Sequence, residues 1–269
     1  MIVFPNCKIN IGLYVTAKRP DGYHDIATVF HPVDLFDVLE LIPRRDKKVV
    51  LHPSGIVLPG VDTDNLCIKA WQLLHDTYDA VKGADIYLHK AIPMGAGLGG
   101  GSADGAFMLS TMNALCQLNL SDEQLMHYAL MLGSDCPFFI QNNSCFAKGR
   151  GEVMEPLSIH LNEYKIVLIN PGIHISTAFA FAQIKPDTDL FDLTTIPTIP
   201  VGEWKNHISN VFEAGVAAAY PVIATIKTTL YELGAVYASM TGTGSTVYGL
   251  FPKNQSVQLS FPPEWILKS

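Results

Sequence analysis

The sequence predicts a protein of mixed strands and helices that forms two lobes or one large domain. Its 269 residues can bury a large core, and 48% hydrophobic with 16% charged residues is typical of a folded chain. Residues 7–17 alternate between apolar and polar side chains, as a strand with one apolar face does. Residues 108–116 instead repeat apolar side chains at helical spacing, so both kinds of element are expected.

The charge and the cysteines limit the partners and the compartment that we expect. A net charge of −7 argues against non-specific binding to nucleic acid or to an anionic membrane. No apolar stretch reaches the roughly 18 residues that a membrane span needs, and the first residues lack the features of a secretion signal. The five cysteines and nine histidines are dispersed, without metal-ligand spacing. We therefore expect a cytoplasmic protein with reduced thiols, a small-molecule substrate and no protein-built metal site; no particular oligomeric state is indicated.

The first expected strand carries two polar side chains on the face opposite its apolar one. Lys8 and Asn10 lie two residues apart, on the same side as Gly12, which leaves room beside them. A solvated outer face is the ordinary explanation for a lysine in a strand. The pattern therefore leaves open whether Lys8 is a surface residue or part of a site.

A turn follows this strand. Pro20, Asp21 and Gly22 are typical turn residues, and Tyr23 and His24 come directly after them. An aromatic ring and an imidazole at a turn tip fit an ordinary surface, and they also fit one wall of a pocket for a flat ring.

Asn65 marks the start of an expected helix. Apolar residues recur at helical spacing from Leu66 to Leu74, and asparagine is a preferred N-cap residue because its side chain accepts a hydrogen bond from the first turn. The pattern by itself predicts a structural cap at Asn65.

The strongest functional signal is a glycine-rich segment between an expected strand at residues 84–90 and an expected helix at residues 102–116. Five glycines fall within residues 95–101. Ordering so many glycines is costly, which makes physical sense where bare backbone approaches a ligand closely. A glycine loop before a helix presents unpaired N–H groups and the positive end of the helix dipole, which suit a phosphate group. The segment therefore predicts a nucleotide-phosphate site.

Asp135 stands between Gly133, where a helix is expected to end, and Pro137. Aspartate is a preferred helix cap and proline is tolerated in a first turn, so Asp135 fits the start of a short following helix. It fits equally well a carboxylate that is held near a substrate hydroxyl.

The second half of the chain is expected to combine strands and helices. Strands are predicted at residues 164–170, 235–240 and 245–251, and helices at residues 207–220 and 221–233. The loop Thr241–Ser245 between the last two strands is explained by a hairpin turn alone. We place the lobe boundary after the basic segment at residues 148–150, which gives an N-terminal lobe of residues 1–153 and a C-terminal lobe of residues 154–269.

Three classes of nucleotide-binding protein compete for the glycine-rich segment. Residues 95–100 match the G-x-G-x-x-G pattern of dinucleotide-dependent oxidoreductases, but a helix cap at Ser121–Gln124 occupies the window where a second strand should end in an acid. A P-loop kinase is excluded because G-x-x-x-x-G-K-S/T does not occur. A non-catalytic nucleotide-binding module would leave Lys8 and Asp135 unexplained.

The segment Pro93–Ser102 resembles the phosphate loop of the superfamily named for galactokinase, homoserine kinase, mevalonate kinase and phosphomevalonate kinase. Further matches lie at Lys8–Asn10, Lys18–His24, Gly133–Pro137 and Thr241–Ser245, so the resemblance covers roughly residues 8–251. These motifs are similar to those of the member family that uses ATP to phosphorylate an alcohol carrying a cytidine diphosphate group, in the non-mevalonate route to isoprenoid precursors. The resemblance implies a two-lobed α+β small-molecule kinase fold with a ferredoxin-like C-terminal lobe.

The resemblance also implies the catalytic residues. Asp135 is expected to act as base toward the substrate hydroxyl, with Lys8 beside it. An adjacent cation would keep Asp135 ionised and stabilise charge on the moving phosphoryl group. Because phosphoryl transfer has a loose transition state, alignment of the hydroxyl and neutralisation of charge matter more than base strength.

The donor site is implied in the same way. ATP is the expected cosubstrate, with magnesium arriving on the nucleotide, and Asn65 and Lys90 are expected near the adenine end. The ATP phosphates are expected on Pro93, Met94, Gly95, Ala96, Gly97, Leu98, Gly99, Gly100, Gly101, Ser102 and Ala103. Ala103 departs from the family pattern, which has a second small hydroxyl residue there, and Asp104 follows it. We therefore expect Ser102 and backbone N–H groups to contact the phosphates.

The acceptor site is the last part that the resemblance implies. His24 is expected to read the edge of the cytosine base while Tyr23 stacks on it. The residues expected to contact the cytidine diphosphate group or to line its site are Asn10, Tyr23, His24, Thr177, Gly242 and Thr243.

Overall fold

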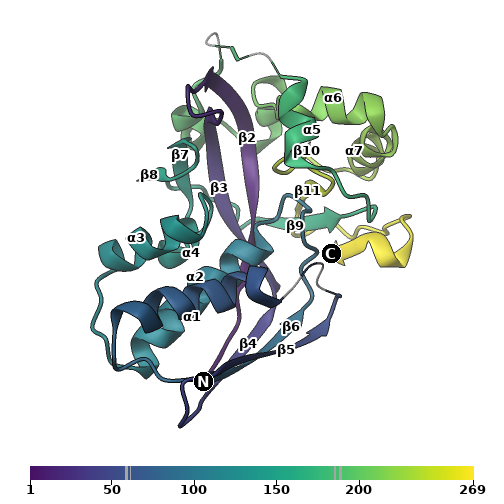
Figure 1. Cartoon of the computed structure of the whole chain (residues 1–269). Helices are drawn as coiled ribbons and strands as arrows, with labels where there is room; N and C mark the ends of the chain where they lie inside the picture. The colour runs from purple at the N-terminus through teal and green to yellow at the C-terminus, as the bar shows by residue number, and fades with distance from the viewer. Residues whose placement is uncertain (58–59, 61, 185, 188–189) are drawn as a thin grey trace. The chain divides into compact units, whose positions relative to one another are not determined.

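The computed structural model describes residues 1–57, 60, 62–184, 186–187 and 190–269 (Figure 1). The chain divides into two compact units: the first holds residues 1–7, 34–94 and 99–143, and the second holds residues 8–33, 95–98 and 144–269. The chain passes between them within strands β2 (Asn6–Lys18) and β3 (His24–Phe36), within the glycine-rich segment, and between residues 143 and 144. The units do not follow a single cut in the chain, and the lobe division at residue 153 stays a prediction.

The first unit contains a four-stranded sheet with the order β1-β4-β6-β5. Strands β4 and β6 are antiparallel, whereas β5 and β6 are parallel. The bounds are β1 (Ile2–Val3), β4 (Val38–Pro43), β5 (Val49–Gly55) and β6 (Ala84–Lys90). Strand β6 coincides with the predicted strand at residues 84–90, and it leads directly into the glycine-rich segment.

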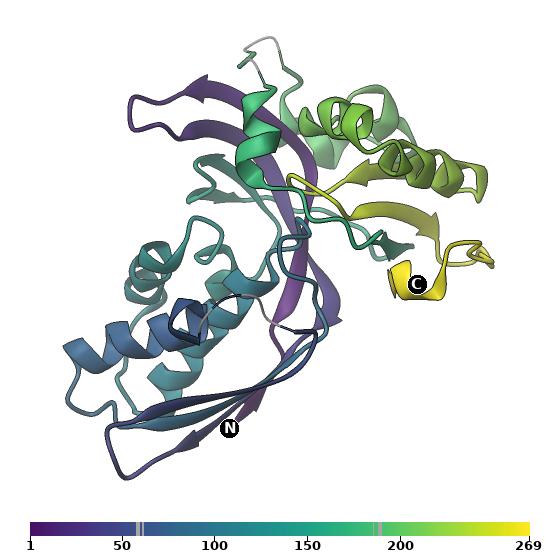
Figure 2. The same ribbon diagram turned by 45° about the vertical axis from the view of Figure 1, so that its right-hand side comes forward.

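Helices cover one face of this sheet, as Figure 2 shows for α1 and α2. The bounds are η1 (Asp62–Asp64), α1 (Leu66–Thr77), α2 (Gly100–Leu115), α3 (Asp122–Leu132) and α4 (Phe138–Gln141). Burial of apolar side chains from both layers removes them from water and holds the layers together. The core includes Leu39, Leu41, Ile86 and Leu88 from the sheet, Cys67, Ala70, Trp71 and Leu74 from α1, and Met108, Leu109 and Met112 from α2.

The helix starts follow from local capping. Asn65 caps α1 as predicted, because its Oδ1 accepts a hydrogen bond from the backbone N–H of Cys67 at 2.8 Å. Helix α2 begins at Gly100, two residues earlier than expected, so part of the glycine-rich segment forms its first turn.

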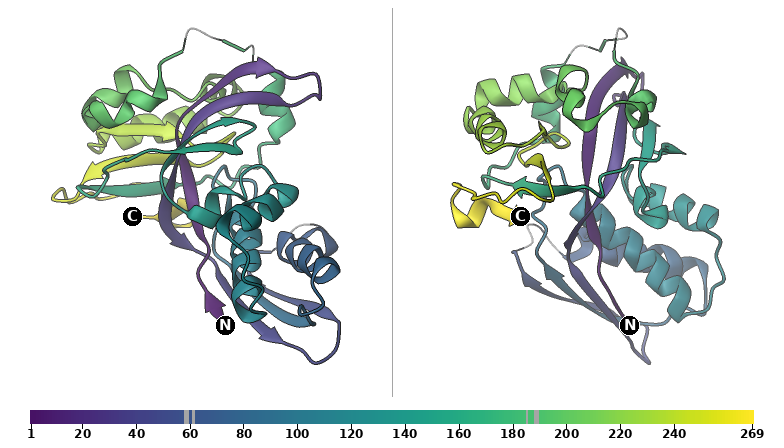
Figure 3. Two further views of the ribbon diagram at one scale, coloured as in Figure 1. Left: turned by 90° about the vertical axis from the view of Figure 1, so that its left-hand side faces the viewer. Right: turned by 180° about the vertical axis from the view of Figure 1, so that it is seen from behind.

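The second unit combines a sheet of order β10-β11-β9-β12 with the part of sheet β2-β3-β7-β8 that lies in this unit. The remaining strands are β7 (Cys145–Gly149), β8 (Val153–Pro156), β9 (Tyr164–Ile169), β10 (Tyr237–Met240), β11 (Val247–Pro252) and β12 (Ile266–Lys268). Its helices are α5 (Thr177–Ala182), η2 (Leu193–Thr198), η3 (Val201–Asn206), α6 (Phe212–Ala219), α7 (Val222–Glu232) and η4 (Pro263–Trp265). Helices α6 and α7 lie beside the first of these sheets (Figure 3), and they share its apolar core.

The predicted start of a helix at residue 207 is wrong. Helix α6 begins at Phe212, because Asn210 uses its side chain to tie the preceding segment to the chain after β10. Its Nδ2 donates to the carbonyls of Met240 and Gly242, each at 2.8 Å, and its Oδ1 accepts from the N–H of Phe212 at 3.0 Å. These bonds fix residues 210 and 211 as a turn before the helix.

Candidate active site

The end of the glycine-rich segment forms an uncapped helix start in the first unit. Gly99 is the N-cap residue of α2 and has no side chain to cap the helix. The first-turn N–H groups at Gly100, Gly101 and Ser102 therefore point out of the helix start without a capping side chain. Together with the positive end of the helix dipole, this arrangement suits an anionic ligand such as a phosphate group.

The middle of the segment, residues 95–98, packs against the loop between β10 and β11 in the second unit. Gly97 accepts a hydrogen bond from Thr241 Oγ1 at 3.0 Å through its carbonyl. A Cβ atom on Gly97 would lie 2.1 Å from the carbonyl oxygen of Thr241, so only glycine fits there. The loop Thr241–Ser245 is thus more than a hairpin turn, because it holds part of the glycine-rich segment in place.

Lys8 and Asn10 are buried rather than solvated. They are 4% and 3% exposed, and Lys8 Nζ donates to Asn10 Oδ1 at 2.6 Å. The ammonium group also lies 4.8 Å from the centre of the Phe30 ring, a cation–π distance. The surface interpretation of the polar strand face is therefore wrong.

Asn10 joins Lys8 to the β10–β11 loop. Its Nδ2 donates to Thr28 Oγ1 at 2.9 Å, and its backbone N–H donates to Thr241 Oγ1 at 3.0 Å. Its Oδ1 also accepts from the N–H of Gly242 at 3.1 Å. The network fixes the amide of Asn10, and Lys8 is oriented through it.

Asp135 does not cap the short helix that follows it. Helix α4 begins at Phe138, with Pro137 as N-cap and no side-chain cap bond, so the cap interpretation of Asp135 is wrong. The neighbouring Cys136 thiol hydrogen-bonds to Ser102, which brings the Asp135 segment beside the start of α2 within the first unit. Burial raises the pKa of the Cys136 thiol to about 12, Asp135 adds to this shift and the bond to Ser102 opposes it. Lys8 belongs to the second unit, and its partnership with Asp135 stays a prediction.

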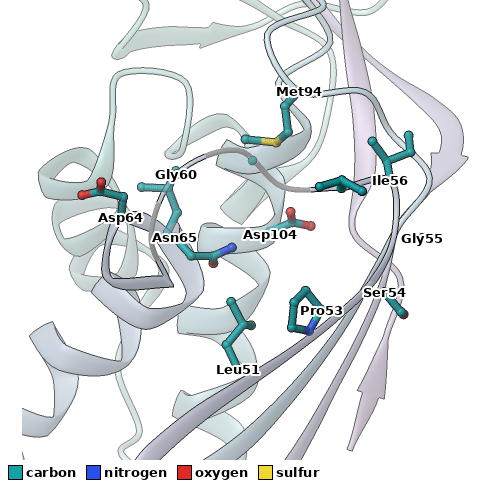
Figure 4. Close-up of a pocket in the computed structure, with 13 residues that line it drawn as sticks. Leu51, Pro53, Ser54, Gly55, Ile56, Gly60, Asp64, Asn65, Met94 and Asp104 are labelled. Carbon is teal, nitrogen blue, oxygen red and sulfur yellow. The ribbon is translucent and has the colours of Figure 1, made fainter.

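A cavity of about 300 Å³ opens in the first unit beside the glycine-rich segment (Figure 4). Asn65 lines it from the start of α1, and Met94 and Gly101 line it from the glycine-rich segment. Its other lining residues are Leu51, Pro53, Ser54, Gly55, Ile56, Val57, Gly60, Asp64, Leu66 and Asp104. The walls are mostly apolar, as in pockets that take a flat ring.

Lys90 is buried in a charge cluster at the end of β6. Its side chain is fully buried, and Nζ forms ion pairs with Asp37 and, at 2.7 Å, with Asp104. Asp37 Oδ1 also accepts from the backbone N–H groups of Ala91 and Ile92 at 2.7 and 2.9 Å. Burial lowers the pKa of Lys90, but the attraction of Asp104 and Asp37 outweighs it and holds the pKa above its usual value. The ammonium group therefore serves this cluster, which joins the end of β6 to α2.

The residues expected on the acceptor side lie in the second unit. The His24 ring stacks on Phe181 of helix α5, with ring centres 4.7 Å apart. Tyr23 is 56% exposed, and the Arg150 guanidinium lies 5.1 Å from the centre of its ring. Thr177 is the first residue of α5 and is exposed. Stacking on Phe181 brings His24 together with α5, the helix that carries Thr177.

Three residues that contact predicted site residues gave no functional signal in the sequence: Phe181 contacts His24, and Asp37 and Asp104 contact Lys90. Phe181 gave no signal beyond its place in a run of aromatic and alanine residues. Asp37 lies far from Lys90 in the chain, so only the fold brings them together. Asp104 was noted for its position after Ala103, but its pairing with Lys90 depends on where α2 begins.

The described residues contain no cluster of three or more histidine, cysteine or acidic side chains that would bind a metal ion. No helix in the described part of the chain has the length and apolar character that a membrane crossing requires.

Comparison with known proteins defines the class of the protein. The family model for the N-terminal domain of GHMP kinases matches residues 65–143, and the model for the C-terminal domain matches residues 201–260. A solved 4-(cytidine 5'-diphospho)-2C-methyl-D-erythritol kinase superposes with a TM-score of 0.77 at 30% identity, over 93% of this chain and 90% of that one. The mevalonate kinase of Methanococcus jannaschii shares the fold, with a TM-score of 0.69 at 14% identity over 94% and 91% of the two chains. The protein is thus a kinase with the GHMP kinase fold, and the predicted α+β fold class is confirmed.

Curated relatives narrow the class further. The 4-diphosphocytidyl-2-C-methyl-D-erythritol kinase of Bacteroides fragilis is 49% identical over 264 residues, which cover 97% of this chain and 96% of the relative. The enzyme of the same name from Bacteroides thetaiotaomicron is 50% identical over 253 residues, which cover 93% and 92%. The chain belongs to the family of 4-diphosphocytidyl-2-C-methyl-D-erythritol kinases.

Proposed function

We propose that this enzyme transfers the γ-phosphoryl group of ATP to the 2-hydroxyl of 4-diphosphocytidyl-2-C-methyl-D-erythritol, in the non-mevalonate route to isoprenoid precursors. The observation that carries the proposal is the uncapped start of α2, next to an apolar cavity in the same unit. A phosphate chain on the helix start and a purine ring in the cavity would use both features. Family membership then supplies the acceptor.

In this proposal the nucleotide is bound by backbone N–H groups and by side chains that contact it, while one further side chain positions this part of the site. Backbone N–H groups between Pro93 and Ala103 and the Ser102 hydroxyl bind the phosphates, while Asn65 faces the adenine from the cavity wall. Lys90 positions the site without contacting the nucleotide. Its buried ion pair with Asp37 holds the backbone of Ala91 and Ile92, and its ion pair with Asp104 holds α2. We therefore assign Lys90 a positioning role rather than a direct contact through its ammonium group.

Magnesium arrives with the nucleotide and supplies charge neutralisation on the phosphate oxygens. A magnesium ion bound mainly by phosphate oxygens and water needs only one or two carboxylates from the protein. We assign no particular side chain to the ion.

Asp135 accepts the proton of the substrate hydroxyl as its oxygen bonds to the γ-phosphorus, the bond from the γ-phosphorus to the β,γ-bridging oxygen breaks, and ADP leaves. Lys8 stabilises the charge on the phosphoryl group during the transfer. The fixed position of Lys8, bonded to Asn10 and packed on Phe30, supports this role because a preorganised cation needs no rearrangement during the reaction. The carboxylate of Asp135 orients the hydroxyl, which matters more than its basicity in a loose transition state.

The cytidine diphosphate group is bound by the second unit in this proposal. His24 reads the base edge, Tyr23 stacks on the ring, and Asn10, Thr177, Gly242 and Thr243 line the remainder of the site. The stacking of His24 on Phe181 supports the assignment, because it fixes the imidazole plane before the base arrives. We place the reaction in the cytoplasm, in agreement with five cysteines that are all free thiols.

The test is ATP consumption with 4-diphosphocytidyl-2-C-methyl-D-erythritol compared with galactose, homoserine and mevalonate. We expect turnover with the first alcohol alone; equal or better turnover with another would refute the proposed acceptor. NAD(P)⁺ should show no saturable binding, and tight binding would restore the oxidoreductase alternative.

A further inference from the structure

One buried carboxylate oxygen has no role in the function described so far. Asp104 is 3% exposed, and its Oδ2 accepts a hydrogen bond from Lys90 Nζ at 2.7 Å. Its Oδ1 has no hydrogen-bond partner in the part of the chain that the structure describes. Buried carboxylate oxygens are normally satisfied, because an unpaired one loses its solvation without compensation. A bound ligand is the natural source of the missing donor.

The unsatisfied oxygen belongs to a side chain that lines the cavity of the first unit. Asp104 lies on α2, one turn after Gly101, which lines the same cavity. Asn65 lines it from α1; its Oδ1 is used in the helix cap, and Figure 4 shows its amide nitrogen on the side that faces Asp104. The cavity thus offers an acceptor and an amide donor between apolar walls.

The walls and these two polar groups indicate what the cavity binds. Apolar residues on both sides, among them Leu51, Ile56 and Met94, suit the faces of an aromatic ring better than a polyhydroxylated sugar. The edge of such a ring must then present a hydrogen-bond donor to Asp104 and an acceptor to Asn65. Adenine offers this combination through its 6-amino group and a ring nitrogen, whereas a 6-oxopurine presents an acceptor oxygen where adenine has the amino group.

We propose that Asp104 Oδ1 accepts a hydrogen bond from the 6-amino group of the bound adenine and thereby selects ATP over 6-oxopurine nucleotides. The inference rests on the proposed function, which puts the adenine in this cavity. Asp104 contacts the nucleotide base in this arrangement, and Lys90 fixes the carboxylate through Oδ2. An oxopurine would bring its carbonyl oxygen against the carboxylate, which is repulsive.

The charged and titratable groups around Asp104 make this selection depend on pH. Lys90 faces it from β6, Asp37 from the segment before β4, and Cys67 from α1. Asp64, on η1, lies on the cavity wall. Burial raises the pKa of Asp104 to about 7, the attraction of Lys90 opposes this shift, and the repulsion of Asp37 and a hydrogen bond to it add to the shift. Above this pH the ionised carboxylate accepts from an amino group and repels an oxo group, whereas the neutral acid below it lacks the charge that rejects an oxo group.

Equilibrium binding of nucleotides without the acceptor substrate tests the inference. Displacement of a fluorescent ATP analogue gives the Kd values of ATP and ITP, a 6-oxopurine nucleotide, at about pH 8 and about pH 6. We expect ATP to bind roughly tenfold to a hundredfold more tightly than ITP at the higher pH, with a smaller ratio at the lower pH. Asp104→Asn should reduce the ratio to about threefold or less at both values, because an amide can present either an acceptor or a donor.

Asp76→Asn is the matched control. Asp76 is an exposed carboxylate on α1, and its loss changes the net charge equally while leaving the ATP/ITP ratio as in the unmodified enzyme. If Asp104→Asn does not fold, the ATP/ITP affinity ratio of the unmodified enzyme still tests the inference, because it should be smaller at about pH 6 than at about pH 8.

Three outcomes would overturn the inference. Equal affinity for ATP and ITP at both pH values would remove the base contact while leaving ATP binding, and so the proposed function, intact. A change in the preference of Asp104→Asn between ATP and 2′-deoxy-ATP, with the ATP/ITP ratio unchanged, would put Asp104 at the ribose. Absence of ATP binding would overturn the proposed function together with the inference.

Discussion

Replacement of Gly97 by alanine tests the contact between the glycine-rich segment and the β10–β11 loop. Gly97 has φ +78°, a left-handed conformation that costs an alanine about 1–2 kcal/mol. The added Cβ would also lie 2.1 Å from the carbonyl oxygen of Thr241, closer than the 3.0 Å below which Cβ contacts essentially do not occur. One of the two segments must therefore move by about 1 Å, a displacement large enough to disturb alignment for catalysis.

The structure indicates what this movement breaks. Thr241 Oγ1 donates to the Gly97 carbonyl and accepts from the N–H of Asn10, each at 3.0 Å. Loss of both bonds adds about 2 kcal/mol to the backbone cost, for a total destabilisation of roughly 3–4 kcal/mol. A misplacement of about 1 Å also lowers kcat by about a hundredfold.

Gly172→Ala is the matched control, because Gly172 has nearly the same backbone angle, φ +73°, with nothing within 4 Å of the added Cβ. This variant should lose only the backbone cost of about 1–2 kcal/mol and keep its kcat. Denaturant unfolding and steady-state kinetics of the two variants measure both quantities. If Gly97→Ala matches Gly172→Ala in stability and in kcat, the contact with Thr241 has no role in holding the loop.

Three further predictions concern the site residues. Asp135→Asn should bind both substrates with nearly unchanged Kd and lose about 10²- to 10⁴-fold in kcat, and full activity would remove the base assignment. His24→Ala should lower the preference for the cytidine over the uridine form of the acceptor by about tenfold, measured as a ratio of kcat/KM; an unchanged ratio would argue against base reading by His24. Lys90→Met should cost about 3–5 kcal/mol in denaturant unfolding, because it leaves Asp37 and Asp104 buried without their cation. The folded-state pKa of Asp104 lies at about 7, above the unfolded value of 3.8, so its contribution to the free energy of unfolding falls as pH rises from 3.8 to about 7. The stability lost in Lys90→Met should therefore be smaller at about pH 5 than at about pH 8. A loss that is no smaller at pH 5 would contradict the argument that Lys90 neutralises buried carboxylates.

Local patterns were sufficient for the elements whose ends are set by nearby residues. The strand at residues 84–90 and the start of α1 at Asn65 were predicted correctly, because alternation and capping act over a few residues. The prediction of a helix from residue 207 was wrong because its start depends on contacts with distant residues. Asn210 bonds to carbonyls about thirty residues later, and no local pattern carries that information.

The candidate site likewise has parts that local sequence predicts and parts that only the fold shows. The glycine-rich segment was identified from its composition, since glycine density is a local feature with a direct physical meaning. The burial of Lys8 could not be predicted from the sequence, because the alternating pattern of a strand does not show which face packs against the rest of the protein. The cluster of Asp37, Lys90 and Asp104 joins residues from β6, α2 and the link between β3 and β4, so only the folded chain brings it together.

The residues proposed for the nucleotide and most of those proposed for the acceptor belong to different units. The cavity and the start of α2, where the nucleotide is expected, belong to the first unit, whereas Lys8, Asn10, Tyr23 and His24 belong to the second. Residues 95–98 of the glycine-rich segment pack within the second unit, although the chain on both sides of them belongs to the first. The segment that we propose to bind the phosphates is therefore continuous in the chain with the start of α2, and its residue Gly97 is bonded to the loop that Asn10 holds. A change at Gly97 should accordingly alter the KM values of both substrates. Asp104→Asn, which changes a residue of the first unit, should alter the KM of the nucleotide and leave that of the alcohol unchanged.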